Sequence, residues 1–259
     1  MKNKTTFICQ NCGFHSPKWL GRCPSCGEWS TLIEEIEEEF SAEISFAPSE
    51  PCLYEKIEET KKKRIETGIE ELNRVLGGGI VPGSLVLIGG APGIGKSTLL
   101  LQVSRDFAVK GEKVLYVSGE ESLEQIKLRG DRLGVKGGEM YLLAETNVER
   151  IISHAEKLNP RVFVLDSVQA VFSSKLSSTP GTISQVREVT NQVFRFAKKN
   201  EIPSFLIRNK LKLLKNKLGN NKRSIYESRI ANIVYPTVNY HACVKYFIAS
   251  PNALLFKKV

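Results

Sequence analysis

The sequence lacks the long apolar segments of membrane and secreted proteins. No apolar run approaches the roughly 20 residues that a membrane-spanning helix needs. Met1–Thr5 is not followed, before Cys9, by the apolar stretch of a signal peptide. No internal repeat is visible. We therefore expect a cytoplasmic protein that does not enter a membrane and whose cysteine thiols stay reduced.

Acidic residues and glycines are scarce in the last fifth of the chain. Residues 208–259 contain 11 lysines and arginines, no aspartate, one acid, Glu227, and only Gly219 of the 20 glycines. Residues 1–207 are almost neutral, so this segment carries the whole net charge of +9. Because composition and pattern change together, the preferred hypothesis is an anomalous basic tail, translated out of the ancestral frame. The alternative is a basic interaction tail.

Four cysteines near the amino terminus form two Cys-x-x-Cys pairs, Cys9 with Cys12 and Cys23 with Cys26. Two such turns can direct four thiolates at one tetrahedral Zn²⁺ ion. A redox dithiol would instead be expected as a single pair that opens a helix. We predict a zinc ribbon over residues 1–31, stabilised mostly by metal–ligand bonds because the segment is too short for an adequate apolar core.

Two tryptophans, Trp19 and Trp29, flank the second cysteine pair together with Lys18 and Arg22. The preferred interpretation is that the tryptophans cover the metal site, since so small a module has few other apolar groups. The alternative is that they stack on unstacked bases. The two cations remain open as DNA contacts.

A glycine-rich loop with the pattern G-x-x-x-x-G-K-S lies between an expected strand, Ser84–Ile88, and an expected helix that begins near Thr98. Its backbone amides would bind the phosphates of ATP, Lys96 would reach the β and γ phosphates, and the Ser97 hydroxyl would bind Mg²⁺. The predicted nucleotide-binding residues are Gly90, Ala91, Pro92, Gly93, Ile94, Gly95, Lys96, Ser97 and Thr98, together with the carboxylate Asp166.

Asp166 ends an apolar strand that begins at Arg161, and at the carboxyl edge of a parallel sheet it would be the second Mg²⁺ ligand. A helix cap is the alternative. Another strand, from Val114, ends at Glu120 and Glu121. We predict that Glu120 is the base and, with Lys96, a catalytic residue. Glu121 is the alternative base, or both carboxylates cap a helix beginning near Ser122.

Apolar strands alternate with helical stretches from residue 85 to 207, which predicts an α/β fold with a parallel sheet flanked by helices and preceded by the zinc ribbon. The domains would be the ribbon, an acidic linker over 32–63, an ATPase core over 64–207 and the tail over 208–259. Strands are expected near 85–88, 114–118, 140–143, 161–165 and 202–207, and helices near 97–109, 122–133, 147–158 and 184–200.

Several longer segments, beyond the generic loop, resemble the bacterial RadA (Sms) DNA-repair family. They are Pro17–Trp29, Thr67–Gly79, Tyr116–Ser122, Asp166–Gln169 and Leu176–Glu188. The resemblance spans nearly all of residues 6–207. It implies a RecA-like P-loop ATPase that binds single-stranded or branched DNA, forms homo-hexameric rings, works with a recombinase and promotes branch migration.

The chain departs from the family pattern after Ile207. Arg208 and Asn209 stand where the family has a Gly-His segment, and neither the family's Lys-Asn-Arg-Phe-Gly motif nor its Lon-like domain is found. We therefore expect nucleotide binding without branch migration. Three hypotheses follow: a DNA-dependent repair ATPase, a non-catalytic zinc and nucleic-acid-binding fragment, and a RecA-like signalling ATPase.

Overall fold

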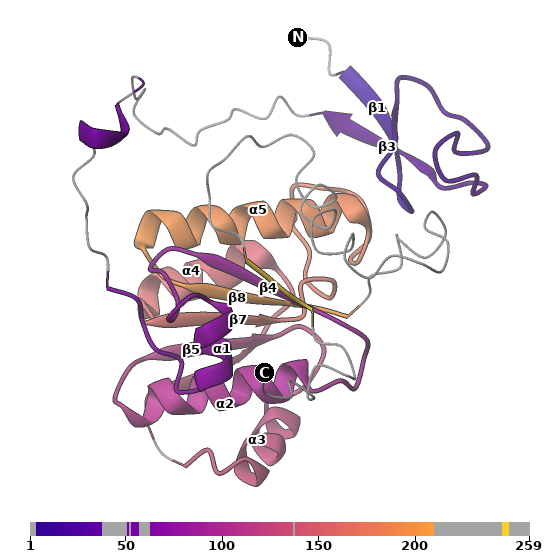
Figure 1. Cartoon of the computed structure of the whole chain (residues 1–259). Helices are drawn as coiled ribbons and strands as arrows, with labels where there is room; N and C mark the ends of the chain where they lie inside the picture. The colour runs from indigo at the N-terminus through magenta and orange to yellow at the C-terminus, as the bar shows by residue number, and fades with distance from the viewer. Residues whose placement is uncertain are drawn as a thin grey trace, which may run out of the picture.

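The computed structural model describes residues 4–37, 51, 53–56, 63–136, 138–209 and 245–248. These residues form a small antiparallel ribbon and a larger α/β unit (Figure 1). Residues 38–50, 52 and 57–62 of the expected acidic linker, and most of the expected tail, lie outside the described residues. None of the described helices has both the length and the apolar character needed to traverse a bilayer.

The ribbon is a three-stranded sheet in the order β2-β1-β3. It consists of β1 (Lys4–Cys9), β2 (His15–Ser16) and β3 (Leu32–Glu37). β3 pairs with all of β1, from Cys9 opposite Leu32 to Lys4 opposite Glu37. The ribbon sheet therefore extends past Thr31, the expected boundary, because β1 supplies backbone partners for six residues that the sequence placed in the linker. The 3₁₀ turn η1 (Tyr54–Lys56) follows.

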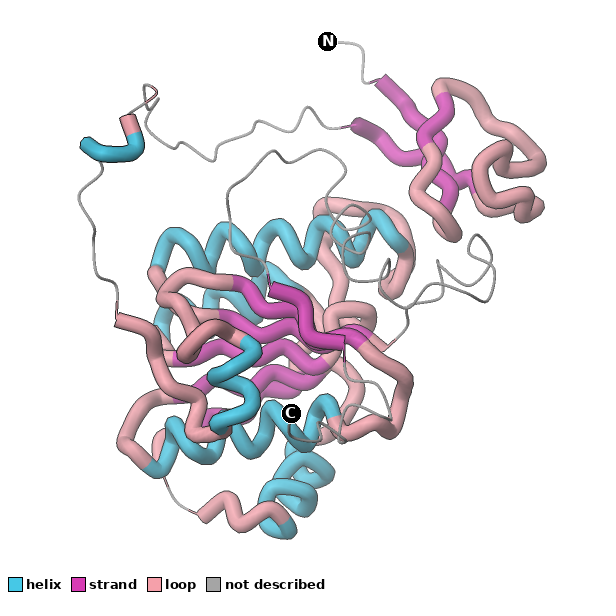
Figure 2. Tube along the Cα trace, viewed as in Figure 1, coloured by secondary structure: helices cyan, strands magenta, loops and turns pink. Residues whose placement is uncertain are grey.

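The α/β unit contains a parallel sheet in the order β6-β5-β7-β8-β4-β9. Its strands are β4 (Leu85–Gly89), β5 (Val114–Ser118), β6 (Met140–Ala144), β7 (Val162–Asp166), β8 (Ser204–Arg208) and β9 (Lys245–Ile248). Five of them correspond to the strands expected from the sequence, so the predicted α/β fold is confirmed. Figure 2 shows the strands side by side between two layers of helix.

Helices cover both faces of the sheet, with α4 and α5 on one side and α2 and α3 on the other (Figure 1). The four predicted helices are present as α2 (Lys96–Val109), α3 (Leu123–Arg132), α4 (Val148–Leu158) and α5 (Ile183–Asn200). The sequence did not predict α1 (Glu70–Val75), because six residues are too few to show a helical period. Asn73 Oδ1 anchors α1 by accepting hydrogen bonds from the Thr67 amide and hydroxyl at 2.9 and 2.8 Å.

Alternate residues of each central strand enter two separate apolar cores. In β7, Val162 and Val164 pack on the side of α2, whereas Phe163 and Leu165 pack on the side of α4 and α5. This follows from the two-residue period of a strand, and burial on both faces explains why the strands are almost continuously apolar. The carboxyl ends of these strands are held at one edge of the sheet.

The sheet includes residues from beyond Ile207, the expected end of the core. β8 continues through Arg208, which pairs with Gly89 of β4, and β9 pairs in parallel with β4 from Val86 opposite Lys245. Burial lowers the pKa of the Arg208 guanidinium. The boundary differs from the expected one because backbone groups on the free side of β4 accept an added strand with little regard to its side chains.

Truncating Phe163 tests the core between the sheet and α5. Its side chain is fully buried and its ring meets that of Phe196 edge-on, with 5.6 Å between centroids. We expect Phe163→Ala to lower the free energy of unfolding by about 3–5 kcal/mol in urea titrations. The control is Leu128→Ala on α3, where the side chain is 61% exposed and the expected change is within about 0.5 kcal/mol. Equal losses in the two variants would contradict this packing.

Candidate functional site

The four cysteine sulfurs of the ribbon converge on one point. All four Sγ atoms lie within 4.8 Å of one another, with Cys9 3.7 Å from Cys26 and Cys12 3.5 Å from Cys23. A tetrahedral ion with bonds of about 2.3 Å separates its sulfur ligands by about 3.8 Å. The spacing of the four sulfurs therefore fits Zn²⁺. A set of four thiolate ligands in tetrahedral geometry is also one that zinc prefers.

Two equivalent turns present these sulfurs. The Cys9 carbonyl accepts a hydrogen bond from the Gly13 amide at 2.7 Å, and the Cys23 carbonyl accepts one from the Gly27 amide at 2.9 Å. Gly13 and Gly27 have φ angles of 72° and 77°, in the left-handed region that favours glycine. Sequence reasoning named the cysteines but not these glycines, although a glycine directly follows each second cysteine.

The pKa values of Cys9 and Cys12 are shifted in opposite directions. Burial raises the pKa of Cys12 to about 12. Burial also opposes ionisation of Cys9, but hydrogen bonds with the Thr31 hydroxyl and with the amides of Cys12 and Asn11 lower its pKa to about 6. The Cys9 sulfur lies 3.2 Å from Thr31 Oγ1. Thr31, whose hydroxyl lies beside the Cys9 sulfur, is a supporting residue that the sequence analysis did not single out.

The tryptophans do not cover the metal site. Trp19 and Trp29 are 57% and 69% exposed, and the apolar groups packed with the cysteines are those of Phe7, Phe14, Leu20 and Leu32. The preferred expectation for the tryptophans is therefore wrong. The residues on and beside the ribbon strands already enclose the sulfurs, so the indoles are left at the surface.

The glycine-rich loop joins the end of β4 to the start of α2. Gly95 is the amino-terminal cap of α2, with φ of 96°, so the loop amides and the positive end of the helix dipole face the same space. Beside it lies a cavity of about 300 Å³. Its lining residues are Pro92, Gly93, Gly95, Lys96, Ser97, Thr98, Ser118, Glu120, Glu121, Arg129, Asp166 and Asn209.

The cavity thus brings together most of the predicted nucleotide-binding residues with both predicted carboxylates. Gly90 and Ala91 take part through their carbonyls, which accept hydrogen bonds from Lys96 Nζ at 3.1 and 2.7 Å, whereas Ile94 does not line the cavity. Burial lowers the pKa of Lys96, and the charges of Asp166 and Glu120 oppose that shift. The Lys96 ammonium group is therefore held at the loop, where a phosphate oxygen can replace a carbonyl.

Asp166 is oriented by a buried tyrosine. The Tyr116 hydroxyl donates to Asp166 Oδ2 at 2.7 Å, and Tyr116 itself is fully buried. Burial and the charge of Asp166 hold the pKa of Tyr116 well above its usual value, so the phenol keeps its proton and donates. Asp166 does not cap a helix, since the next described helix, α5, begins far along the chain with Thr182 as its cap.

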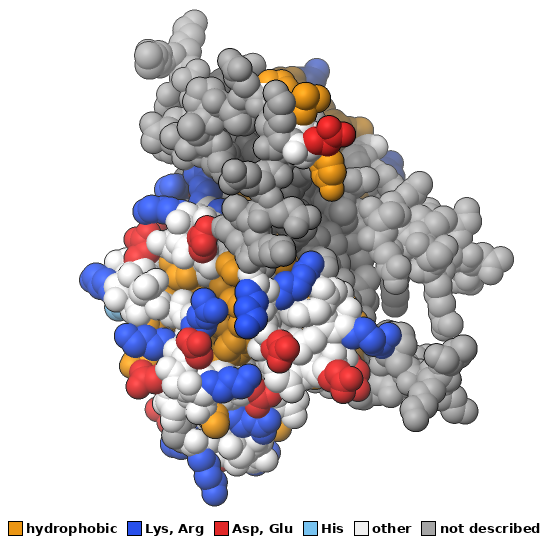
Figure 3. All heavy atoms as spheres, turned by 60° about the vertical axis from the view of Figure 1, so that its left-hand side comes forward, with side chains coloured by type: hydrophobic (Ala, Val, Ile, Leu, Met, Phe, Trp, Pro, Cys, Tyr) orange, Lys and Arg blue, Asp and Glu red, His pale blue; other side chains and the backbone are white. Residues whose placement is uncertain are grey.

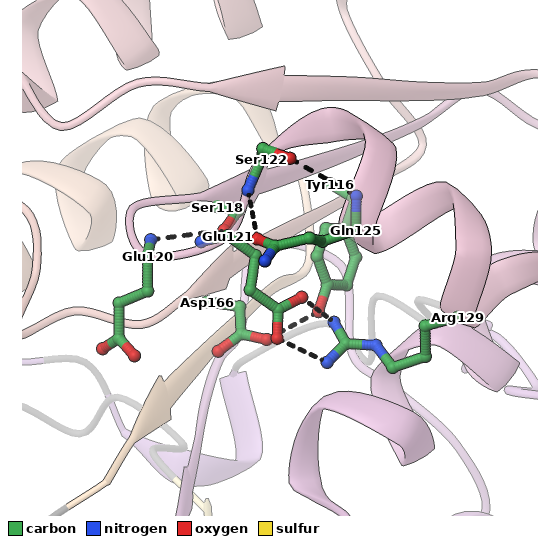
Figure 4. A network of polar contacts seen from close by, with 8 residues as sticks. All are labelled: Tyr116, Ser118, Glu120, Glu121, Ser122, Gln125, Arg129 and Asp166. Atoms are coloured by element: carbon green, nitrogen blue, oxygen red, sulfur yellow. Dashed lines mark hydrogen bonds and ion pairs between the residues drawn. The ribbon is translucent and has the colours of Figure 1, made fainter.

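Glu120 and Glu121 have different surroundings (Figure 4). Arg129 binds Glu121 through both guanidinium nitrogens, with 2.8 Å to each carboxylate oxygen. Glu120 points away from this pair and accepts a hydrogen bond from the Ser167 hydroxyl at 2.5 Å. Asn209 Nδ2 lies 3.5 Å from the same Glu120 oxygen.

Neither glutamate is the cap of α3. Ser122 is that cap, in a reciprocal pair of hydrogen bonds with Gln125. Ser118 Oγ instead accepts hydrogen bonds from the amides of Glu120 and Glu121 at 3.3 and 2.8 Å. These bonds fix the turn between β5 and α3. Ser118, Tyr116, Arg129 and Ser167 were not recognised from the sequence. Tyr116 and Ser167 act on carboxylates from distant parts of the chain, which spacing does not reveal.

Comparison with known proteins agrees with this geometry. Residues 7–34 match the family described as rubredoxin metal binding domain, and residues 65–141 match the ATPase family described as KaiC. The chain is 52% identical over 210 residues to the DNA repair protein RadA of Streptococcus pyogenes serotype M1. It is 48% identical over 213 residues to RadA of Bacillus subtilis and 50% over 209 residues to RadA of Aquifex aeolicus.

The chain belongs to the RadA family. Each of these alignments covers 80% of this chain and 46% of the relative. The chain therefore spans about half the length of the curated relatives it matches. The zinc ribbon and the RecA-like ATPase fold expected from the sequence are both confirmed.

Removing one sulfur tests the metal site. We expect the wild-type chain to carry one zinc ion and Cys23→Ser to lose it, because three thiolates leave the tetrahedral shell open. Metal content measured by atomic spectroscopy checks this. His15→Ala is the control, since His15 is an exposed residue of the ribbon that does not belong to the four-sulfur cluster. Equal zinc in the two variants would contradict the assignment.

Proposed function

We propose that this chain is a DNA-repair ATPase of the RadA type, which hydrolyses ATP in response to single-stranded DNA. The observation that supports it most is the convergence of Lys96, Asp166 and Glu120, from three different elements, on the cavity beside the glycine-rich loop. The family relationship supports the same reaction class. The reduced thiolates of the ribbon favour a cytoplasmic location.

In the proposed reaction the triphosphate of ATP lies along the loop amides, and Lys96 Nζ leaves its carbonyl partners to bind the β and γ phosphates. Ser97 and Asp166 would hold Mg²⁺, which neutralises charge on the phosphates. Glu120 orients a water molecule and accepts its proton as the water oxygen attacks the γ phosphorus. The bond from that phosphorus to the bridging oxygen breaks, and ADP and inorganic phosphate are released.

The surroundings of the two glutamates favour Glu120 as the base. A bidentate ion pair with Arg129 engages both oxygens of Glu121, so neither oxygen is free to orient a water molecule. Both glutamates line the cavity, but the described side chains that hydrogen-bond to the Glu120 carboxylate, Ser167 and Asn209, are neutral. Tyr116 keeps Asp166 in place from below the sheet edge, so the metal ligand and the base have separate supports.

Replacing the proposed base separates binding from turnover. We expect Glu120→Gln to bind ATP as the wild type does and to hydrolyse it at least about 100-fold more slowly, because the amide cannot accept the proton. Fluorescent nucleotide titration and phosphate release measure the two quantities. Glu121→Gln is the control, with a loss of about tenfold or less. Undiminished hydrolysis by Glu120→Gln would remove its role.

The DNA-dependent part of the proposal is supported by the family and not by a charged surface. Residues 1–207 are almost neutral, and Figure 3 shows lysines and arginines interspersed with acids on one face of the α/β unit. The relatives are named as DNA repair proteins. Binding of single-stranded or branched DNA, a homo-hexameric assembly and a recombinase partner are accordingly proposals for this chain.

A titration with single-stranded DNA distinguishes the three hypotheses. We expect the DNA to stimulate ATP hydrolysis, as a DNA-dependent repair ATPase requires. Retained DNA binding without turnover would favour a non-catalytic fragment, and turnover indifferent to DNA would favour a signalling ATPase. Branch migration is not expected from this chain, because the Lys-Asn-Arg-Phe-Gly motif that would link nucleotide state to DNA does not occur in it.

A further inference from the structure

Both tryptophans of the chain lie exposed on the ribbon. Trp19 is 57% exposed and Trp29 is 69% exposed, and the chain contains only these two. Tryptophan is usually buried to a large extent, so two exposed indoles on one small module form an unusual apolar surface of the kind found at interaction sites.

The two rings converge on one residue. A Cβ atom at Gly21 would lie 3.5 Å from Trp19 Cη2 and 3.9 Å from Trp29 Cζ3. A larger residue at position 21 would therefore meet both six-membered rings. The glycine therefore lets both indoles lie beside the same short stretch of backbone.

The backbone around both rings is held in place. Arg22 and Trp29 form an antiparallel bridge, and the Ser30 amide donates to the Gly21 carbonyl at 2.8 Å. Next to Trp19, Ser16 Oγ accepts a hydrogen bond from the Lys18 amide at 3.3 Å and donates one to the Lys18 carbonyl at 2.6 Å. The rings are thus presented by turns whose shape the zinc site and these hydrogen bonds already determine, which lowers the entropic cost of binding.

Cations accompany the rings. The Arg22 guanidinium lies over the Trp29 ring, 5.7 Å from its centroid, and is fixed by donating to the Gly27 carbonyl at 2.9 Å. Lys18 is exposed next to Trp19. Residues 15–30 contain one acid, Glu28. A ligand with flat aromatic faces and negative charges alternating along its length complements this arrangement.

We propose that Trp19 and Trp29 form a stacking platform for the bases of single-stranded nucleic acid, and that Lys18 and Arg22 contact the phosphate groups of the same strand. Bases within a duplex are already stacked and cannot reach the rings, so the platform selects single strands. This inference rests on the DNA-dependent function proposed above. It adds a binding site on the ribbon, separate from the ATPase core.

Tryptophan emission reports on this platform alone, because the chain has no other tryptophan. With the full zinc-loaded chain and no nucleotide, we expect oligothymidylate of about 12 nucleotides to quench the emission. Anisotropy with a labelled oligonucleotide should show roughly 5- to 100-fold weaker binding for Trp19→Ala and for Trp29→Ala. Trp29→Phe should retain most of the affinity, since phenylalanine still stacks.

Controls separate stacking from charge and from folding. Tyr54→Ala removes an aromatic ring that is 89% exposed outside the ribbon, and should bind as the wild type does. Lys18→Gln should reduce the slope of log affinity against log salt concentration by about one, as expected for the loss of one phosphate contact. The quenching of tryptophan emission should persist. Zinc content should stay at the wild-type value in every variant, since neither ring packs on the cysteines.

The outcomes distinguish this site from the proposed ATPase. Unchanged emission with oligothymidylate, or unchanged affinity in both alanine variants, would overturn the platform and leave the rings as a surface for protein docking. Quenching that persists in Lys96→Ala while hydrolysis is absent would support the platform independently of catalysis. DNA-stimulated hydrolysis together with unchanged affinity after loss of both rings would refute the platform and leave the ATPase proposal intact.

Discussion

The parallel register of the central strands is the constraint on which the candidate catalytic site depends. Ser118 lies opposite Asp166, Ile88 opposite Ile207, and Leu165 opposite Leu206. Because the strands run in one direction, the residues that follow them emerge at one edge. Gly119 donates its amide to the Asp166 carbonyl at 2.9 Å, which carries the pairing into the turn that holds Glu120. Hydrogen bonding between strands thus sets the spacing of the site.

Burial gives this register its stability. The central strands are covered on both faces, by two apolar cores that share no side chain. Tyr116 belongs to one core through its ring, yet its hydroxyl reaches Asp166 at the edge. A movement of α2 or α3 that disturbed this core would therefore also move the proposed metal ligand. The ribbon has no comparable core, and its order depends on four sulfurs and two glycine turns.

The main elements could be predicted because their periods are clear. Five strands and four helices were expected near the positions where they occur, since apolar runs of strand length alternate with amphipathic stretches. Shorter or partner-dependent elements were missed. α1 is too short to show a period. The acidic residues of β3 resemble a linker in the sequence, and only the pairing with β1 shows that they form a strand. Arg208 and β9 join the sheet through backbone groups, to which side-chain patterns are a poor guide.

The cysteine spacing and the glycine-rich loop are local patterns, so the residue order alone is enough to identify a zinc ribbon and a phosphate-binding loop. Folding settles matters that involve partners distant in the chain. Arg129 pairs with Glu121 and not with Glu120, and phenylalanines and leucines, not the tryptophans, pack around the cysteines. Neither result can be read from spacing, because each depends on which side chains compete for the same space once the elements are packed.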